Sequence, residues 1–322
     1  MLGLFFDLRN PQPWAKPWPE FYARTLDSIS AAEQMGLHSV WVTEHHLFDD
    51  GYMPQPLTFL SAIAARTSKV VLGTAVTLPA LRPPALVAEE AAVVDQLSGG
   101  RLQLGFGAGY SPREYQLFGA DVAKRYSLTD TAAMEVRRLL DERITTPPAA
   151  QNPFPIWMGY QGPQGARRAG RMGTGLLSLD KSLLEPYRQG LEEGGHDVAT
   201  ARTGGMLDII VADDPESAFE RILPHYAHQL NTYRAASVAG SGAPAPKEIG
   251  LDKLRAQKTG AGSIPGLRVL TVDEAKAAIA EEIADAPVQH VYLWGSVAAM
   301  PDDLADRHIE LVSRELAPHF SA

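Results

Sequence analysis

Short apolar strands alternate with amphipathic helices along the whole 322-residue sequence. Strands separated by helices pair in parallel, and eight such units in a row favour a closed (β/α)8 TIM barrel over an open doubly wound sheet. Because barrels of this size form one domain, we expect a single domain over residues 1–322. The expected strands are Leu2–Asp7, Val40–Val42, Val70–Val76, Arg101–Gly107, Ile156–Gly159, Leu176–Leu179, Gly205–Ala212 and His290–Trp294.

One segment breaks this alternation between the expected seventh and eighth strands. Residues 237–267 are rich in Gly, Ala, Ser and Pro. A long loop with little pattern inside a compact domain is usually either functional or disordered. On the C-terminal face of a barrel it would lie over the active site. We therefore expect residues 237–267 to form an inserted mobile lid, with a disordered loop of no role as the alternative.

The composition argues against several classes of protein. The formal net charge of −9 disfavours nucleic-acid and anionic-membrane partners, because these prefer basic surfaces. The absence of cysteine removes disulfides, thiolate metal sites and cysteine nucleophiles. No apolar run approaches the ~18 residues of a membrane helix, and Met1–Asp7 has the pattern of a strand, not of a signal peptide. We expect a cytoplasmic protein without a membrane partner.

Glu44, His45 and His46 directly follow the second expected strand. In a parallel barrel the catalytic groups lie at the C-terminal ends of the strands, and histidine is the side chain best suited to moving protons near neutral pH. Three adjacent polar groups are costly to bury without a purpose, so catalysis is favoured over packing or capping. We expect one histidine to face the cavity as acid or base, and Glu44 either to fix its tautomer or to pair with a core cation.

A metal site is the alternative for this cluster. Adjacent residues on a strand point to opposite faces, so His45 and His46 do not readily chelate one ion in regular β geometry. His225 and His228 lie three residues apart on a helix, and we expect them at the surface or facing a loop. No metal site is therefore expected.

A second candidate site is the Gly-rich segment Met158–Gly165, which follows the fifth expected strand. The start of the next helix offers unpaired N–H groups and partial positive charge, which suit a phosphate. Barrels frequently bind phosphate at such loops. Arg167 and Arg168 in the first turns would add charge. Simple turn formation is the alternative explanation for these glycines.

A third candidate is Gly105–Tyr110 at the end of the fourth expected strand. The spacing of its glycines does not match a dinucleotide-binding fingerprint. Its small residues would let a flat ligand approach the backbone, and Tyr110 could donate a hydrogen bond to that ligand. A tight strand-to-helix turn explains the same residues equally well.

Together these segments resemble the bacterial luciferase-like flavin monooxygenases, nearly from end to end. The segments that carry the resemblance are Val40–His46, Leu72–Pro79, Asp95–Leu102, Gly107–Tyr110, Phe118-Gly119, Val291–Trp294 and Met300-Pro301.

The resemblance implies that reduced FMN, or a deazaflavin in some branches, binds with its ring over the C-terminal mouth of the barrel. It implies that His45 is the catalytic imidazole and that Glu44 belongs to the same motif. It also implies a non-proline cis peptide bond beside the ring, expected at Thr74–Ala75. The cofactor-binding residues that it implies are Thr74, Ala75, Gly107, Tyr110, Gln161, Gly162, Gly165, Arg168 and Ser178, with Leu179 beside the last.

One departure from the family pattern bears on the cofactor. The luciferases proper carry a reactive Cys and an Arg at the end of the fourth strand, where this chain has Gly107 and Ala108. Light emission is therefore not expected. Phosphate anchoring is expected to rest on Arg167, Arg168 and backbone amides instead.

The resemblance implies a two-component monooxygenase, in which a separate flavin reductase supplies reduced FMN. The expected co-substrates are oxygen and a small or medium apolar molecule such as an aldehyde, ketone or terpene. A deazaflavin-dependent hydride-transfer enzyme is the first alternative, although Glu44 favours FMN because deazaflavin branches often carry another acid there. A non-catalytic flavin-binding barrel is the second alternative. The residues expected to contact the substrate are Phe6, His46, Phe106 and Trp294, for which (as for Trp41) packing in the barrel core is the competing role.

The resemblance further implies a homodimer. Family members commonly dimerise through the helices after the second and third strands, here Leu57–Arg66 and Pro83–Leu97. The small side chains expected to allow close packing of these helices are Ala85, Ala88, Ala91 and Ala92.

Overall fold

A closed parallel barrel of eight strands forms the centre of the computed structural model, which describes residues 1–320. The strand order around the barrel is β1-β11-β7-β6-β5-β4-β3-β2, with every neighbouring pair parallel. The expected (β/α)8 fold is confirmed, and the last two residues of the expected domain lie outside the described part. The barrel strands are β1 (Leu2–Phe6), β2 (Ser39–Val42), β3 (Val71–Thr74), β4 (Leu102–Phe106), β5 (Ile156–Met158), β6 (Gly175–Leu177), β7 (Thr203–Leu207) and β11 (Val288–Trp294).

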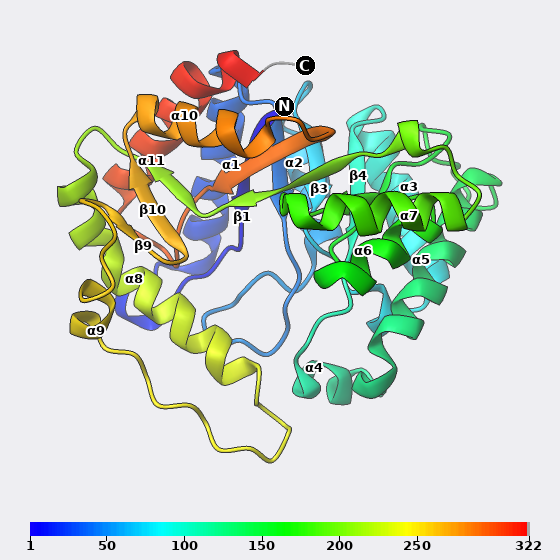
Figure 1. Ribbon diagram of the computed structural model, residues 1–322, viewed down its shortest axis with the longest axis horizontal. Coiled ribbons are helices and arrows are strands. Elements are labelled where there is room, and N and C mark those ends of the chain that lie inside the picture. The colour runs from blue at the N-terminus through cyan, green and yellow to red at the C-terminus, as the bar shows by residue number, and fades with distance from the viewer. Residues whose placement is uncertain (321–322) are drawn as a thin grey trace.

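Helices surround this barrel on its outside (Figure 1). Six of them have a proline in the first turn, where its missing N–H costs nothing. Helix α3 ends at Gly99, whose φ of 69° is the left-handed conformation that glycine supplies at a helix end. The helices are α1 (Trp18–Gln34), α2 (Pro56–Ala64), α3 (Pro84–Ser98), α4 (Pro112–Leu117), α5 (Arg125–Asp141), α6 (Gly162–Arg171), α7 (Leu184–Glu193), α8 (Pro215–Ala236), α9 (Leu251–Arg255), α10 (Val272–Ile283) and α11 (Asp302–Glu310). Among residues 1–320, no helix combines the length and apolarity needed to cross a membrane.

The expected seventh strand, Gly205–Ala212, is wrong as a single element. The chain leaves the barrel at Asp208, and the following residues form β8 (Ile209–Val211) in a separate three-stranded sheet. In that sheet β10 (Leu267–Leu270) pairs in parallel with β8 and antiparallel with β9 (Ser263–Ile264). The apolar run is continuous in sequence, so nothing local signals the change of pairing partner.

The expected loop at 237–267 is also only partly correct. Helix α9 and strand β9 lie within it, and only residues 237–250 connect α8 to α9 without a helix or strand. In Figure 1 this yellow segment extends from the end of α8. Hydrogen bonds between Asn231 and the backbone of Ile249 tie its far end to α8, and Gln116 of α4 donates to the carbonyl of Gly240.

Large aromatic side chains fill the barrel interior, and glycines on neighbouring strands make room for them. Trp41 on β2 is paired with Gly73 on β3, and Trp157 on β5 is paired with Gly175 on β6. A Cβ atom at either glycine would lie 2.2 Å from the indole of its tryptophan. These glycines are therefore needed for packing, because closely packed interiors have no space to yield.

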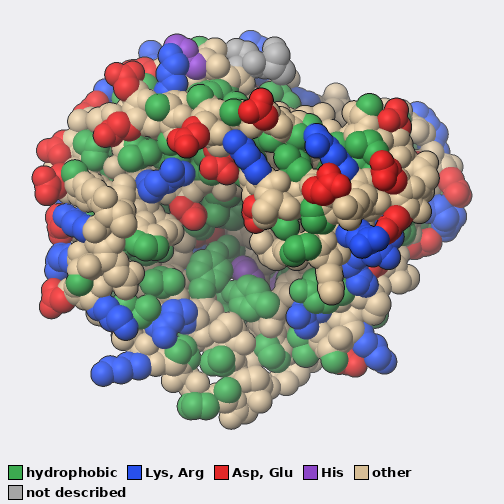
Figure 2. All heavy atoms as spheres, in the orientation of Figure 1, with side chains coloured by type: hydrophobic (Ala, Val, Ile, Leu, Met, Phe, Trp, Pro, Cys, Tyr) green, Lys and Arg blue, Asp and Glu red, His purple; other side chains and the backbone are tan. Residues whose placement is uncertain are grey.

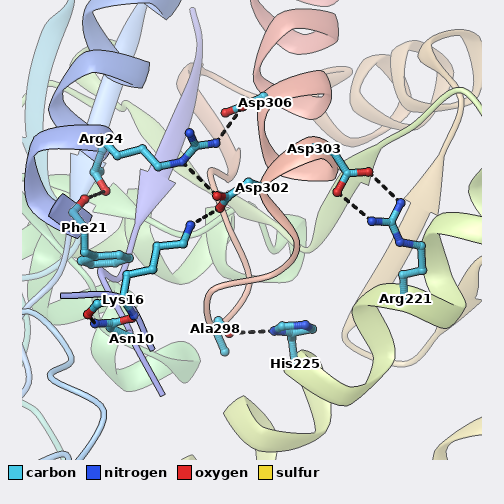
Figure 3. A network of polar contacts seen from close by, with 11 residues as sticks. Asn10, Lys16, Phe21, Arg24, Arg221, His225, Ala298, Asp302, Asp303 and Asp306 are labelled. Atoms are coloured by element: carbon cyan, nitrogen blue, oxygen red, sulfur yellow. Dashed lines mark hydrogen bonds and ion pairs between the residues drawn. The ribbon is translucent and has the colours of Figure 1, made fainter. Parts of the chain in front are cut away.

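Ion pairs connect helix α11 to its neighbours (Figure 3). Asp302 pairs with Lys16 and Arg24, and Arg24 also contacts Asp306 at 2.7 Å. Asp303 forms a two-bond pair with Arg221 of α8 at 2.7 and 2.8 Å. Asp302 and Asp303 lie in the first turn of α11, where negative charge is favourable.

His225 faces a loop, which is one of the two expected positions, but it does not lie at the surface. His225 is buried, its ring centroid lies 3.8 Å from that of Trp14, and its Nδ1 lies 3.0 Å from the carbonyl oxygen of Ala298 (Figure 3). Burial lowers the pKa of His225, so the neutral ring is favoured there. The helical face on which it lies packs against the loop after β11, which the spacing of two histidines does not reveal.

Candidate active site

The side chain of His45 is held by a buried carboxylate from a distant helix. Nδ1 of His45 lies 2.8 Å from Oε1 of Glu114 on α4, and the backbone N–H of His46 donates to the same oxygen at 2.8 Å. Glu114 is fully buried and His45 is 7% exposed. A carboxylate oxygen accepts hydrogen bonds, so a proton on Nδ1 of His45 completes this contact and Nε2 is the ring nitrogen that Glu114 does not engage.

Glu44 does not contact His45, and the expectation that it fixes that ring or pairs with a core cation is wrong. Its Oε1 lies 2.9 Å from Nε2 of His46, and its Oε2 accepts from the backbone N–H of Leu78 at 3.0 Å. Successive side chains point to opposite sides, so His45 contacts Glu114 and His46 contacts Glu44. Glu44 therefore ties the end of β2 to the loop after β3.

His45 lines a cavity of about 350 Å³ at the mouth of the barrel. Figure 2 shows a hollow in this face with a histidine at its floor and hydrophobic side chains around it. A second cavity of about 1000 Å³ adjoins the first, and both are lined by Ala75, Val76, Gly159 and Gln161. The two together form one site over the C-terminal ends of the strands, where barrel enzymes bind ligands.

Val76 lies where the two cavities meet. The peptide bond between Ala75 and Val76 is cis, so the expected cis bond is present but lies one residue later than Thr74–Ala75. A Cβ atom at Gly107 would lie 2.3 Å from the Val76 side chain, and one at Gly159 would lie 2.6 Å from it. Val76 thus occupies part of the space beside these two glycines, and both glycines, the expected Gly107 among them, line the smaller cavity.

Of the other residues expected in the site, Tyr110 lines the smaller cavity and Ser178 the larger. Phe6 and Phe106 are buried in the core and line neither cavity, whereas Phe5 and Tyr292 line the larger one. Trp294 donates from its indole to Asp208 at 3.0 Å. The remaining expected residues, which also line neither cavity, are His46, Thr74, Gly162, Gly165 and Arg168.

Aromatic rings form the wall behind His45. Ring centroids of Phe48, Tyr52, Tyr110 and Tyr233 lie 4.7–6.0 Å from that of His45. Burial raises the pKa of Tyr52, Tyr110 and Tyr233 above the ordinary tyrosine value. These hydroxyls therefore stay protonated at neutral pH, and Tyr110 is a hydrogen-bond donor at the cavity wall.

A buried charged cluster supports this wall. The guanidinium of Arg9 lies 4.6–5.1 Å from the rings of Phe48, Tyr52 and Tyr233. Its side chain is fully buried, with Asp7 and Asp50 3.9 and 3.6 Å from Nε. His228 lies 2.8 Å from the carboxylate of Asp50. Burial raises the pKa of Asp7 to about 6, against the opposing charge of Arg9.

The raised pKa of Asp7 predicts a pH-dependent stability. A carboxyl whose pKa is higher in the folded state favours folding below its unfolded pKa and loses that contribution as pH rises through about 6. Asp7→Asn removes this component. Between pH 5 and 7.5 the free energy of unfolding of the natural protein should fall by about 1 kcal/mol relative to the variant. Urea denaturation of both proteins at the two pH values measures this, and parallel changes would contradict it.

The Gly-rich segment forms the loop and first turn of α6, as expected, but the two arginines after it are already paired. Arg167 is exposed and bonds Glu193. Arg168 bonds Asp130 at 3.1 Å and faces a separate surface depression. The arginine that lines the cavity with His45 is Arg125, the first residue of α5.

Two functional candidates were thus missed by sequence reasoning, Glu114 and Arg125. Glu114 lies 69 residues from His45, and no local pattern connects them. Arg125 follows a short 3-10 helix and belongs to no motif. Within residues 1–320, no group of three or more His, Asp or Glu side chains is arranged to hold a metal ion.

Known proteins share this architecture. The sequence model of the luciferase-like monooxygenases matches residues 2–311. The F420-dependent glucose-6-phosphate dehydrogenase of Kineococcus radiotolerans is 31% identical over 232 residues, covering 61% of this chain and 66% of that protein. The 4-hydroxyprotoasukamycin monooxygenase of Streptomyces nodosus subsp. asukaensis is 27% identical over 241 residues, covering 66% of this chain and 65% of that protein.

These alignments span about two thirds of the length of both curated relatives. Among solved structures, the monooxygenase RslO1 of Streptomyces bottropensis is 25% identical and has a TM-score of 0.79, covering 99% of each chain. The match of the family model over nearly all of the sequence, on a closed barrel with a histidine at the mouth, shows that the chain belongs to the luciferase-like monooxygenase family.

Proposed function

We propose that the protein is a two-component flavin-dependent monooxygenase, which uses reduced FMN from a separate reductase and oxygen to oxidise a small or medium apolar substrate. The observation that carries the proposal is the pair of His45 and Glu114, a buried imidazole and carboxylate on the wall of a cavity at the barrel mouth. Enzymes of this kind need a positioned proton-transfer group beside the cofactor and a site that excludes water.

The residues of the site fit a flavin. The cavities meet at Val76, whose apolar side chain can pack against a flavin ring. The start of α6 has no side-chain cap, so its backbone N–H groups can donate to a phosphate. Gln161 lines both cavities and can bond the polar edge of a ring or its side chain. Bound reduced FMN would supply the electrons and the site of reaction with oxygen, which amino-acid side chains cannot provide.

The chain's own residues then have separate tasks. Glu114 holds Nδ1 of His45, so that Nε2 can accept or return a proton at the reacting centre. Tyr110 can donate a hydrogen bond from the cavity wall. Phe5, Leu177 and Tyr292 form an apolar part of the larger cavity, on which an apolar substrate would pack, and the rest of its lining includes Lys181, Arg268 and Glu281.

The alternative is a deazaflavin enzyme that transfers hydride without using oxygen. The likeness to an F420-dependent dehydrogenase supports it. The same His45 could transfer the proton in either reaction. The identity of the bound cofactor therefore distinguishes the monooxygenase from the deazaflavin enzyme. A non-catalytic flavin-binding barrel is the remaining alternative, and the buried His45–Glu114 pair argues against it because a mere binder gains nothing from that cost.

Cofactor titration tests the proposal. Purified protein is titrated with FMN, reduced FMN and a deazaflavin under anaerobic conditions, and then assayed for oxygen uptake with candidate aldehydes and ketones. Preference for reduced FMN together with substrate-dependent oxygen uptake supports a monooxygenase. Preference for the deazaflavin without oxygen uptake would assign the hydride-transfer alternative, and binding without turnover of any substrate would assign the binder.

We also propose that residues 237–250 act as a lid. They lie next to α4, the helix that carries Glu114, through the bond from Gln116 to Gly240. Side chains along 241–250 are nearly all exposed, so little apolar contact holds the segment in place. Ligand binding should then slow cleavage of this segment in limited proteolysis, and an unchanged rate at saturating FMN and substrate would refute the lid.

We further propose a homodimer, through a different face of α3 than the alanines suggest. Ala88, Ala91 and Ala92 are buried against the chain's own core and so are not available to a partner. The expected Ala85 is exposed, and the large apolar side chains that α3 presents to solvent are Leu86, Val93 and Leu97, which follow one another at helical spacing and are 50%, 44% and 54% exposed.

A charge placed in this stripe should prevent association. Leu97→Glu is expected to shift the protein from dimer to monomer, because an unpaired carboxylate would be buried in an apolar contact. Sedimentation velocity at micromolar concentration measures the change. Leu117→Glu on α4 is a matched control, since Leu117 is 53% exposed but lies outside the stripe. A dimer that persists in Leu97→Glu, or a natural protein that is monomeric, would contradict this interface.

A further inference from the structure

Three aromatic rings of the site wall have a second neighbour behind them. The ring centroids of Phe48, Tyr52 and Tyr233 lie 5.0, 4.7 and 6.0 Å from that of His45. The same three centroids lie 5.1, 4.6 and 4.9 Å from the guanidinium carbon of Arg9. Arg9 itself lines neither cavity of the site. Any effect of Arg9 on the reaction is therefore exerted through these rings.

Arg9 joins three parts of the chain that are distant in sequence. It follows the end of β1, two of the rings belong to the loop between β2 and α2, and Tyr233 lies in the last turn of α8. Nη1 of Arg9 donates to Oγ1 of Thr232, also on α8, at 2.8 Å. The hydroxyls of Tyr52 and Tyr233 lie 2.6 Å apart and connect the loop to the helix. The position of the wall thus depends on contacts that meet at Arg9.

The placement of Arg9 is unfavourable by itself. Its side chain is fully buried, and its Nε and Nη2 atoms have no hydrogen-bond partner among residues 1–320. The backbone of Leu8, directly before it, has a φ of 56°, a left-handed conformation that residues with a side chain rarely adopt. An apolar side chain of similar volume often stabilises a fold as well as a buried charge network does. Packing alone therefore does not account for Arg9, and strain of this kind points to function.

Neighbouring carboxylates balance the charge of Arg9 without satisfying its donors. Asp7 and Asp50 lie 3.9 and 3.6 Å from Nε, too far for a hydrogen bond. The guanidinium is therefore fixed by its bond to Thr232 and by the three aromatic rings around it. A planar guanidinium can stack on such rings, which the compact ammonium group of a lysine cannot do in the same way.

We propose that Arg9 is a positioning residue for proton transfer by His45. The proposal rests on the function proposed above and adds a second restraint on the imidazole. Glu114 fixes Nδ1 of His45, and the three rings limit the motion of the imidazole that this single contact leaves free. Small displacements of a positioned group reduce the rate strongly. Loosening the wall should therefore lower turnover although Arg9 does not touch the substrate.

The test removes the charge and the donors of Arg9 and keeps its bulk. Arg9→Met has a long unbranched side chain, so it preserves much of the packing in the cluster. The kcat of the reaction, with reduced FMN supplied by a reductase, should fall by about 10–100-fold. The KM for the substrate and the dissociation constant of FMN should change little. Arg9→Lys keeps the charge but not the planar group, so it should recover only part of the lost kcat.

A double-mutant cycle shows whether Arg9 acts through His45. In the His45→Ala background, Arg9→Met should cause little further loss of turnover, because the group that Arg9 positions is gone. Thr232→Val removes only the anchor on α8 and should lower kcat in the same direction by a smaller factor. This variant leaves the charged groups of the cluster in place, so it tests the proposal even where Arg9→Met does not fold.

Nuclear magnetic resonance reports on His45 without flavin or turnover. In protein with 13C-labelled histidine, the Hε1 proton of His45 is assigned by its absence in His45→Ala, and its chemical shift depends on the neighbouring aromatic rings. Arg9→Met should move and broaden this signal. Arg101→Met is the matched control, because Arg101 donates to backbone carbonyls of Thr67 and Val70 at the base of the barrel. It should lower stability in urea without changing kcat or the His45 signal.

The outcomes separate this inference from the proposed function. A lower kcat with unchanged KM, no further loss in the His45→Ala background and a moved His45 signal support the role of Arg9. Unchanged kcat in Arg9→Met, a full further loss in the His45→Ala background, or an unmoved His45 signal would each overturn it. Failure of the natural protein to bind any flavin would overturn the proposed function itself, and the His45 signal would still show whether Arg9 positions the imidazole.

Discussion

Turnover should fall by ~10²-fold or more when His45 is replaced by alanine, the range expected for removal of a positioned acid–base group. The imidazole is 7% exposed, lines the cavity and is held by Glu114 at 2.8 Å. Alanine leaves that carboxylate bonded only to the backbone of His46. The measurement is substrate-dependent oxygen consumption with reduced FMN supplied by a reductase, at saturating flavin.

Two further measurements make this prediction specific. FMN affinity should change little in His45→Ala, because the backbone donors at the start of α6, which are proposed to bind the phosphate, do not involve His45. His319→Ala is the matched control, since His319 is exposed near the end of the described chain. Near-normal turnover in His45→Ala would remove His45 from the chemistry, and an equal loss in His319→Ala would indicate a general effect on folding.

Replacing Trp41 with alanine should cost about 3–5 kcal/mol of folding free energy, as for other large aromatic side chains removed from a core. Trp41 is fully buried, stacks on Tyr292 at 4.9 Å and donates from its indole to Ser39 at 3.0 Å. Since a domain is stable by only about 5–15 kcal/mol, this variant should be marginally folded. Urea denaturation measures the loss, and Leu117→Ala on the surface should change stability by less than about 0.5 kcal/mol.

A double-mutant cycle shows whether the cost arises from the packing described. Gly73→Ala alone should destabilise the protein, because its Cβ would lie 2.2 Å from the Trp41 ring. In the Trp41→Ala background the same change should be tolerated, since the ring is gone, so the two effects should not add. Strict additivity, or a cost below about 1 kcal/mol for Trp41→Ala, would contradict this account of the barrel core.

The alternation of strands and helices was sufficient to predict the barrel, because each unit has a local pattern. The prediction failed at Asp208, where one continuous apolar segment contributes strands to two different sheets. Which strand pairs with β8 depends on β10, and that contact lies far along the sequence. It failed again for Phe5 and Phe6, because a shift of one residue in a strand exchanges its two faces. Phe5 lines the larger cavity, and Phe6 packs in the core.

The position of the site could be predicted from the sequence, but the side chains that contact one another in it could not. His45 was recognised because a strand end in a barrel has a known position relative to the mouth. Glu114 and Arg125 were not recognised from the sequence. Glu114 is identified by its burial beside His45, and Arg125 is identified because, among residues 1–320, it lacks the carboxylate partner that Arg167 and Arg168 have. Arg167 and Arg168 have the same charge as Arg125 and lie nearer to the Gly-rich segment, but Glu193 and Asp130 engage them. Side-chain pairing between distant elements decides such cases.

The central claim is that this barrel binds reduced FMN and controls its reaction with oxygen. The most direct test is to bind reduced FMN anaerobically, mix rapidly with oxygenated buffer, and follow flavin absorbance with time. The account predicts that bound flavin is oxidised with kinetics different from free reduced FMN, and that His45→Ala alters those kinetics without loss of binding. Oxidation of the flavin at the rate of the free cofactor, in the natural protein and the variant alike, would contradict it.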